Sequence, residues 1–243
     1  MPSWEITTLE YDVPLKKLLE RRLSESDTEA SIHTVEDGVL VRISKSGTSA
    51  LAEATAKVLL RDLQYLVLAK MADAMPLSLS EKRVVLTDAL YTARLREERA
   101  PVTHALIEYL KDTSALCLDG FLHFRMQEVL MLWQLCVEQA TGKVYVQKEY
   151  GELMQALQAY VRSQRARMGE LRLCIHADGS CTLMDDDRLM IEYADSSPDG
   201  LVTLLVNMAP QRLVIYDESG GAQERLCNAL KEVFSDRIEV KRR

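Results

Sequence analysis

The segment 217–221 combines residue types that could bind a ligand: two carboxylates, a hydroxyl and a glycine pair. Its members are Asp217, Glu218, Ser219, Gly220 and Gly221. They follow an apolar strand pattern and precede a predicted helix, and in open α/β sheets ligands bind beyond the carboxyl ends of strands. A glycine pair before a helix also leaves backbone amides free for an anion. The competing interpretation is a glycine turn whose acidic residues stabilise the helix N-terminus, because two carboxylates repel a phosphate unless a cation bridges them.

Cys174, His176 and Cys181 could supply three metal ligands on one side of a predicted hairpin. If Asp178 and Gly179 are its two central turn residues, His176 lies opposite Cys181, and Cys174 shares their face. Zinc sites usually contain paired Cys-x₂-Cys ligands and a fourth donor, and the sequence offers neither at this place. Cysteine is also a common buried residue. We therefore predict no bound metal and no cofactor.

Two further charged segments were considered as sites. The run Asp185–Asp187 could attract a hard cation, but calcium-loop spacing is absent, so a solvated turn is predicted. Three of four closely spaced arginines lie near the end of a predicted helix, where the helix dipole favours cations. A nucleic-acid surface is the alternative, and it would require other basic segments to converge on the same face. The four are Arg162, Arg165, Arg167 and Arg172.

No catalytic residues are predicted, since the sequence contains no H-E-x-x-H, G-x-S-x-G or Walker motif. The central elements are predicted to be two long helices within residues 117–168, joined by a turn at Gly142. Apolar residues recur at intervals of three and four in both, which is typical of a buried helix face. Arg125 and Glu149 are predicted to form an ion pair that fixes the register of these helices. The alternative for this pair is the lining of a pocket.

The whole pattern predicts an α+β fold with three domains. Residues 1–47 form a small α/β subdomain of order β-α-β-β, in which Asp37-Gly38 turns a hairpin. Residues 48–168 form a central five-helix layer with short connections. Residues 169–243 form a C-terminal β-β-β-α-β-α-β mixed-sheet unit that ends in a parallel crossover.

The composition is that of a water-soluble protein. Apolar residues make up 47% and charged residues 28% of the 243 residues, with a net charge of −7. An acidic chain argues against nucleic acid as the main partner. No apolar run approaches the roughly 18 residues of a membrane span, and the first residues do not form a signal peptide. Five scattered cysteines indicate reduced thiols, so a cytoplasmic location is predicted.

Three segments within residues 119–240 share a pattern with a known family. They are GFLHFRM, KEYGELMQAL and LVNMAPQRLVIYD. The glycine-phenylalanine entry to an arginine-containing helix, the Lys-Glu-Tyr helix and the Asn-x-Ala-Pro step before a strand resemble the YtxC-like sporulation proteins. The resemblance implies a sporulation-associated protein of an endospore-forming bacterium. It implies no established activity and no catalytic residues.

The function expected from these observations is non-enzymatic, through contacts with a protein partner whose identity the sequence does not specify. The apolar surface around Trp133 must be covered either by the chain's own core or by that partner. The first alternative function is a small-ligand or phosphate-handling enzyme that uses the loop 217–221. The second is a nucleic-acid binder that uses the stretch Arg162–Arg172.

Overall fold

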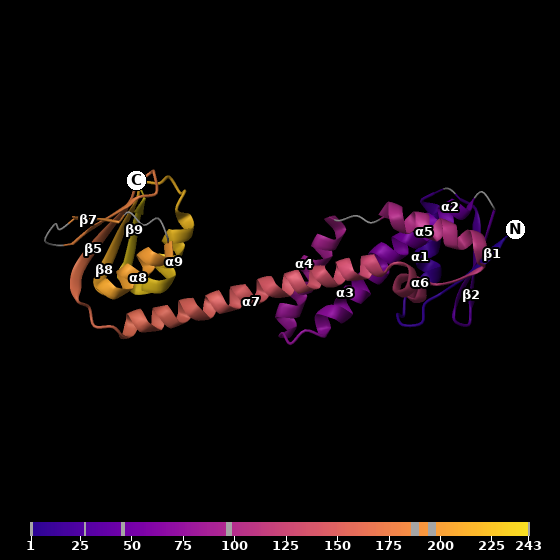
Figure 1. Cartoon of the computed structure of the whole chain (residues 1–243), viewed down its shortest axis with the longest axis horizontal. Helices are drawn as coiled ribbons and strands as arrows, with labels where there is room; N and C mark the ends of the chain where they lie inside the picture. Colours follow the sequence, from indigo (N-terminus) through magenta and orange to yellow (C-terminus); the bar gives the residue numbers. More distant parts are fainter. Residues whose placement is uncertain are drawn as a thin grey trace. The chain divides into compact units, whose positions relative to one another are not determined.

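Two β-sheets organise the chain, one of four strands in the order β2-β3-β1-β4 and one of five in the order β7-β6-β5-β8-β9. They belong to two units, Met1–Tyr145 and Val146–Arg243, each with its own hydrophobic core (Figure 1). The computed structural model describes residues 2–26, 28–44, 47–95, 99–185, 190–193 and 198–242. The predicted α+β class is confirmed.

The N-terminal sheet forms from the predicted β-α-β-β order and one additional strand. The predicted elements are β1 (Ser3–Thr7), α1 (Leu15–Ser24), β2 (Ala30–Val35) and β3 (Gly38–Ile43). The additional strand, β4 (Ala115–Cys117), pairs parallel to β1. Sequence analysis missed β4 because three residues are too few to show a strand periodicity.

The hairpin between β2 and β3 turns one residue earlier than predicted. Val35 pairs with Gly38, so Glu36 and Asp37 are the turn residues. Gly38 instead lies against β1, where an added Cβ atom would be 2.2 Å from the Ile6 carbonyl oxygen. The glycine is therefore required by the close approach of a neighbouring strand rather than by the turn.

One long helical segment follows, and its middle is a π-helix. Its parts are α2 (Thr48–Lys57), the π-helix Val58–Leu63 and α3 (Gln64–Asp73). The Gln64 N–H donates to the Leu59 carbonyl, which leaves the Leu60 carbonyl without its usual helical partner. The side-chain amide of Gln64 compensates when it is oriented to satisfy both of its atoms: its nitrogen then donates to Leu60 O (2.8 Å), and its oxygen accepts from Trp133 Nε1 (3.0 Å).

The next two helices are α4 (Leu79–Leu95) and α5 (Arg99–Asp112). Helix α4 begins with a capping box, which the spacing Ser78-x-x-Glu81 indicates. The Ser78 N–H donates to Glu81 Oε2 (2.7 Å), and the Glu81 N–H donates back to Ser78 Oγ (3.4 Å). This reciprocal pair satisfies two amides that would otherwise lack helical partners.

The prediction of two helices joined at Gly142 is wrong. The segment contains α6 (Leu118–Arg125) and then α7 (Gln127–Ser163), a single helix of 37 residues. The break lies at Met126, whose φ of −125° and ψ of 39° interrupt the helical path. A glycine inside a helix costs only about 1 kcal/mol relative to alanine, which the contacts of a long helix can offset. The predicted five-helix layer is therefore replaced by helices α2 to α7, in which the last break lies at Met126 instead of Gly142.

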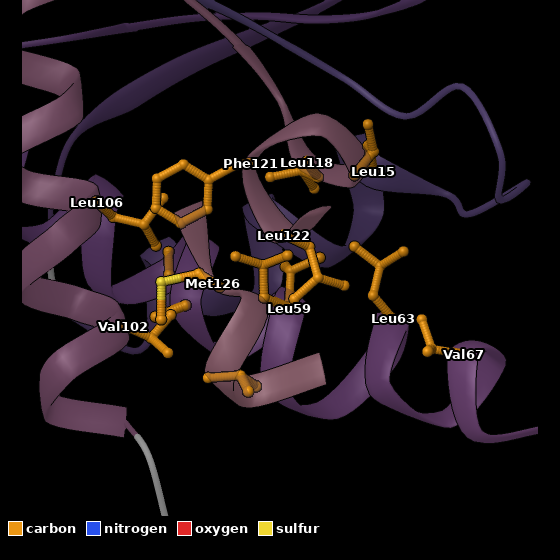
Figure 2. Packing of buried hydrophobic residues seen from close by; sticks show 14 of the residues in the cluster. Leu15, Leu59, Leu63, Val67, Val102, Leu106, Leu118, Phe121, Leu122 and Met126 are labelled. Carbon is orange, nitrogen blue, oxygen red and sulfur yellow. The ribbon is translucent and has the colours of Figure 1, made fainter. Parts of the chain in front are cut away.

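The core of the N-terminal unit joins its sheet and its helices. Leu59, Leu106 and Leu122 come from three different helices and pack near Phe121 (Figure 2). Trp133 in α7 belongs to the same core and is 1% exposed. The question of what covers Trp133 is thus answered by an intramolecular core. This core spans the predicted boundary between residues 47 and 48, whereas the three-domain division itself stays a prediction about independent folding.

The C-terminal unit has the predicted β-β-β-α-β-α-β order. Its elements are β5 (Met168–Ile175), β6 (Cys181–Met184), β7 (Met190–Tyr193), α8 (Pro198–Met208), β8 (Pro210–Asp217), α9 (Glu224–Phe234), a 3₁₀ turn (Ser235–Arg237) and β9 (Ile238–Arg242). Strands β5, β8 and β9 are parallel, which confirms the predicted parallel pairing of the last two strands. Strands β6 and β7 extend the sheet in antiparallel fashion.

One face of this sheet packs against α8, α9 and the last turns of α7. Leu171, Leu173 and Ile175 of β5 alternate onto that face, and Met154 and Val161 of α7 are buried with them. Because successive strand residues point to opposite sides, the other face carries the side chains that intervene in sequence. Polar ones among these are Arg172, Cys174, Thr182, Tyr216, Glu239 and Lys241.

Candidate functional site

The loop 217–221 lies at the carboxyl end of β8, as predicted. The Asp217 side chain is 4% exposed, and its Oδ1 accepts from the Ser219 N–H (3.0 Å) and the Ser219 hydroxyl (2.6 Å). Gly220 and Gly221 have φ values of +63° and +94°, which a residue with a Cβ atom rarely adopts. Helix α9 begins only at Glu224. Asp217 therefore closes a local turn, and the glycines provide its left-handed backbone.

The predicted grouping of Cys174, His176 and Cys181 is wrong in register. Ile175 pairs with Cys181, and Cys174 pairs with Thr182, so Cys181 points to the core face while Cys174 points to the other. Five residues, 176–180, separate the paired residues Ile175 and Cys181, and the His176 N–H donates to the Ser180 carbonyl (2.9 Å). Burial of Cys181 raises the pKa of its thiol above the ordinary value, since desolvation disfavours the thiolate.

Glu218 takes the place that Cys181 was expected to fill. One donor atom each from Cys174, His176 and Glu218 lies within 4.8 Å of the other two. His176 Nδ1 is 3.8 Å from Cys174 Sγ and 3.6 Å from Glu218 Oε2. Its second ring nitrogen, Nε2, is 2.8 Å from Thr182 Oγ1. We call these four residues the β5–β8 cluster.

Parallel pairing of β5 with β8 brings the cluster together. Ile175 is opposite Asp217, so the residues that follow each strand meet at one edge of the sheet. The Glu218 N–H donates to the Ile175 carbonyl (2.9 Å), which fastens the start of the loop beside β5. The sequence alone leaves the two segments as separate candidate sites, because it does not show which strands distant in sequence are paired. One signal could have linked the two segments: a side chain able to bind a metal, His176 or Glu218, comes directly after each of two apolar strands.

The arginine stretch takes part in contacts within the C-terminal unit. Arg162 donates to Ser235 Oγ (3.2 Å), and the Arg172 Nε lies 2.8 Å from Glu170 Oε1. Arg167 donates to the Asn207 carbonyl in the last turn of α8 (3.4 Å) rather than to its own helix. The C-terminus of α7 is instead capped by Arg237, whose guanidinium donates to the Gln164 carbonyl (3.2 Å). Arg167 at the end of α8 and Arg237 at the end of α7 are both stabilising, because a cation near a helix C-terminus interacts favourably with the helix dipole.

Arg125 and Glu149 are not partners across two packed helices, because α7 is continuous. Arg125 precedes α7, whereas Glu149 lies about six turns along it. The Arg125 guanidinium carbon lies 5.9 Å from the centre of the Tyr109 ring, a cation–π contact. Both side chains are exposed. In the acidic run, Asp185 follows β6, and Asp186 and Asp187 lie outside the described residues.

A pocket in the N-terminal unit gathers cationic side chains that sequence analysis did not single out. They are Arg22, Lys57, Arg61, Arg94 and Arg99. They come from α1, α2, the π-helix, α4 and α5, which no single stretch of sequence could have revealed.

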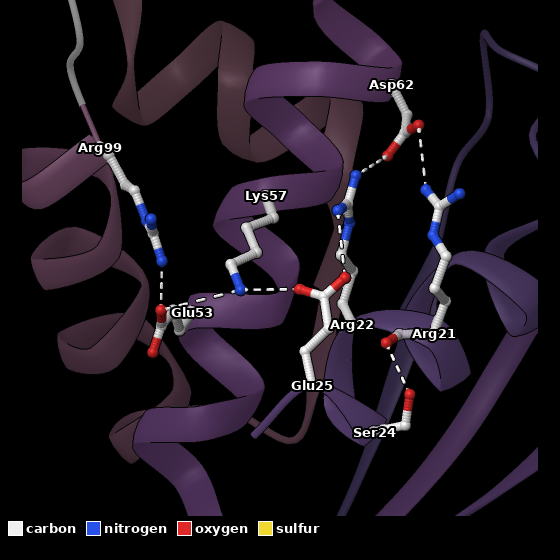
Figure 3. A network of polar contacts seen from close by, with 8 residues as sticks. All are labelled: Arg21, Arg22, Ser24, Glu25, Glu53, Lys57, Asp62 and Arg99. Carbon is white, nitrogen blue, oxygen red and sulfur yellow. Dashed lines mark hydrogen bonds and ion pairs between the residues drawn. The ribbon is translucent and has the colours of Figure 1, made fainter. Parts of the chain in front are cut away.

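Acidic residues bridge several of these cations (Figure 3). Lys57 Nζ lies 3.0 Å from Glu25 Oε2, and Arg99 pairs with Glu53. The hydrogen bond from Lys57 lowers the pKa of the Glu25 carboxyl, because it stabilises the charged form. Such half-exposed pairs contribute little stability singly. The pocket is chiefly an ion-pair network with a positive balance.

Within the described ranges, no helix is both long enough and apolar enough to cross a lipid bilayer. Comparison with curated proteins and with solved structures yielded no match. A sequence model of the YtxC-like family matches residues 78–239, which extends the resemblance noted above towards the N-terminus and covers well over half of the chain. The matched region contains α4 to α9, the whole β5–β8 cluster and the start of β9. The chain therefore belongs to the YtxC-like family.

Proposed function

We propose that this protein is a non-enzymatic cytoplasmic protein of sporulation that acts through contacts with a partner protein. Membership of the YtxC-like family supports the association with sporulation. The observation that supports a contact role is an apolar stripe on α7 within the C-terminal unit. The stripe consists of Val146, Tyr150, Leu153 and Tyr160.

The stripe side chains are between 50% and 66% exposed. Together with the half-buried Leu157 they recur at intervals of four, three, four and three residues. This is the spacing with which one helix packs against another along a seam. The partner we propose is therefore an amphipathic helix of another protein, which would cover the stripe with its own apolar face.

The other two functions have less support. Asp217 and Ser219 bond to each other within the loop, which accounts for them as parts of a turn. Three of the four arginines in the predicted basic stretch contact Ser235, Asn207 or Glu170. Neither group of residues requires a bound ligand to explain its geometry.

The test is a charge substitution on the stripe, Tyr150→Glu with Leu153→Glu, introduced into an endospore-forming host that carries the gene. The matched control is Gln155→Glu with Ala159→Glu, which adds the same charge at exposed positions on the other side of α7. We expect both proteins to keep the wild-type circular dichroism. Only the stripe variant should lower the yield of heat-resistant spores, because a buried unpaired charge prevents helix packing.

Wild-type sporulation by a folded stripe variant would contradict the proposal. The loop is examined in the same host with Asp217→Asn, which retains an oxygen to accept from Ser219. A folded Asp217→Asn protein with a sporulation defect would favour ligand handling by the loop. Light scattering on the purified protein separates self-association from binding to another protein, since only self-association raises the mass of the isolated chain.

A further inference from the structure

The β5–β8 cluster has the donor set and spacing of a metal site. A thiolate, an imidazole and a carboxylate are the three ligand types that zinc accepts in proteins. Zinc–ligand bonds of about 2.0–2.3 Å in a tetrahedron place neighbouring donor atoms about 3.3–3.6 Å apart. The distances from His176 Nδ1 to Cys174 Sγ, 3.8 Å, and to Glu218 Oε2, 3.6 Å, are close to these values.

The histidine ring is already oriented for coordination. With the proton on Nε2, that nitrogen donates to Thr182 Oγ1 at 2.8 Å, and the unprotonated Nδ1 is the ring nitrogen nearer Cys174 and Glu218. Metal-bound histidines nearly always have such a partner on the second nitrogen, which fixes the tautomer and the ring plane. Thr182 is held opposite Cys174 by the pairing of β6 with β5.

The backbone holds the third ligand in place. Glu218 is the first residue after β8, and its N–H donates to the carbonyl of Ile175, directly before His176. Two ligands therefore follow strand ends that are paired to each other, and the third lies within β5. A site carried on paired strands is positioned before the metal arrives, so little ordering is needed on binding.

We propose that Cys174, His176 and Glu218 bind one zinc ion. Three protein ligands leave a fourth tetrahedral position, which water or a partner's side chain can occupy. The side chains of His176 and Glu218 are 39% and 37% exposed, so the ion has a path from solvent. The site uses Glu218 from the loop 217–221 in place of Cys181, which points to the core face of the sheet.

The experiment titrates the reduced, chelator-treated full-length protein with zinc in competition with a chromophoric chelator. We expect one zinc per chain. Replacement of zinc by cobalt should give the thiolate charge-transfer band and the intense visible bands of tetrahedral cobalt. Cys174→Ser, His176→Gln and Glu218→Gln should each weaken zinc binding by at least about tenfold, and Thr182→Val by about 10- to 100-fold as a positioning residue.

Two variants serve as matched controls on the same hairpin. Cys181→Ala removes a thiol from the core face, and Asp178→Asn removes a carboxylate that Ser180 already engages. Both should retain zinc at the wild-type affinity if their circular dichroism is unchanged. Failure of the wild-type protein to bind zinc, or binding that the three ligand variants leave intact, would overturn the proposal. In the first case the cluster is only a set of contacts among the Cys174, His176 and Glu218 side chains.

Discussion

The chemistry of individual residues depends on which face of the C-terminal sheet they occupy. Cys174 and Cys181 are seven residues apart on one hairpin, yet one is half-buried on the polar face and the other is buried in the core. The alternation of side chains along the strands was expected. The observed register places Ile175 instead of His176 opposite Cys181, so that only Cys174 lies near His176. A register error of one residue moves every side chain of a strand to the other face.

This difference predicts the order of cysteine reactivity. In the native, metal-free protein we expect iodoacetamide at mildly alkaline pH to label Cys117 and Cys174, which are half-buried. Cys181 should react much more slowly, because burial limits access and its raised pKa reduces the thiolate fraction. Peptide mass spectrometry over time measures each rate, and denatured protein provides the reference. Equal rates at Cys174 and Cys181 would show that the assigned register is wrong.

Among the elements, α7 shows where sequence patterns lose information. Gly142 fits a helix end in sequence, but a glycine is only weakly unfavourable inside a helix that other contacts stabilise. The observed break between α6 and α7 lies at Met126, and neither this residue nor its immediate neighbours are the glycine or proline that would predict a helix end. Strand β4 was missed because of its length, whereas a capping box such as that at Ser78 needs only two side chains at a fixed spacing, which a sequence shows directly.

The continuity of α7 predicts that Gly142→Ala stabilises the protein. No atom lies within 4 Å of an added Cβ at this position, so alanine should raise the free energy of unfolding by about 0.5–1 kcal/mol. The contrasting variant is Gly38→Ala, whose Cβ would clash with the Ile6 carbonyl and should cost about 1–3 kcal/mol. Urea denaturation followed by circular dichroism measures both. If alanine at 142 destabilises the protein, the helix must end there after all.

At the scale of the whole molecule, the sequence correctly indicated the fold class and the order of the C-terminal elements. The domain limits depend on tertiary contacts that periodicity does not contain. Met154 and Val161 belong to the core of the C-terminal unit, although both precede the predicted boundary at residue 169. Ile6 and Val41 share a core with Leu106, which the boundary at residue 48 separates.

These contacts predict how fragments behave. A fragment of residues 146–243 should fold cooperatively, because it retains every residue of its core cluster. A fragment of residues 169–243 loses Met154 and Val161, and burial of each such side chain is worth about 1.5–3 kcal/mol. We expect the shorter fragment to be less stable by several kcal/mol, out of a typical total of about 5–15 kcal/mol. Chemical denaturation of the two fragments measures the difference, and equal stability would support the boundary at 169.

Strand β9 has one further consequence, which concerns behaviour at high concentration. It forms an edge of the C-terminal sheet and so presents unpaired backbone groups to any chain that approaches. Glu239 pairs with Arg212 and with Lys241, and Lys241 also lies over the Tyr216 ring. Fixed charges of this kind obstruct the addition of a foreign strand. The edge at β9 is therefore protected against intermolecular sheet growth. This protection favours a protein that stays dispersed at high concentration.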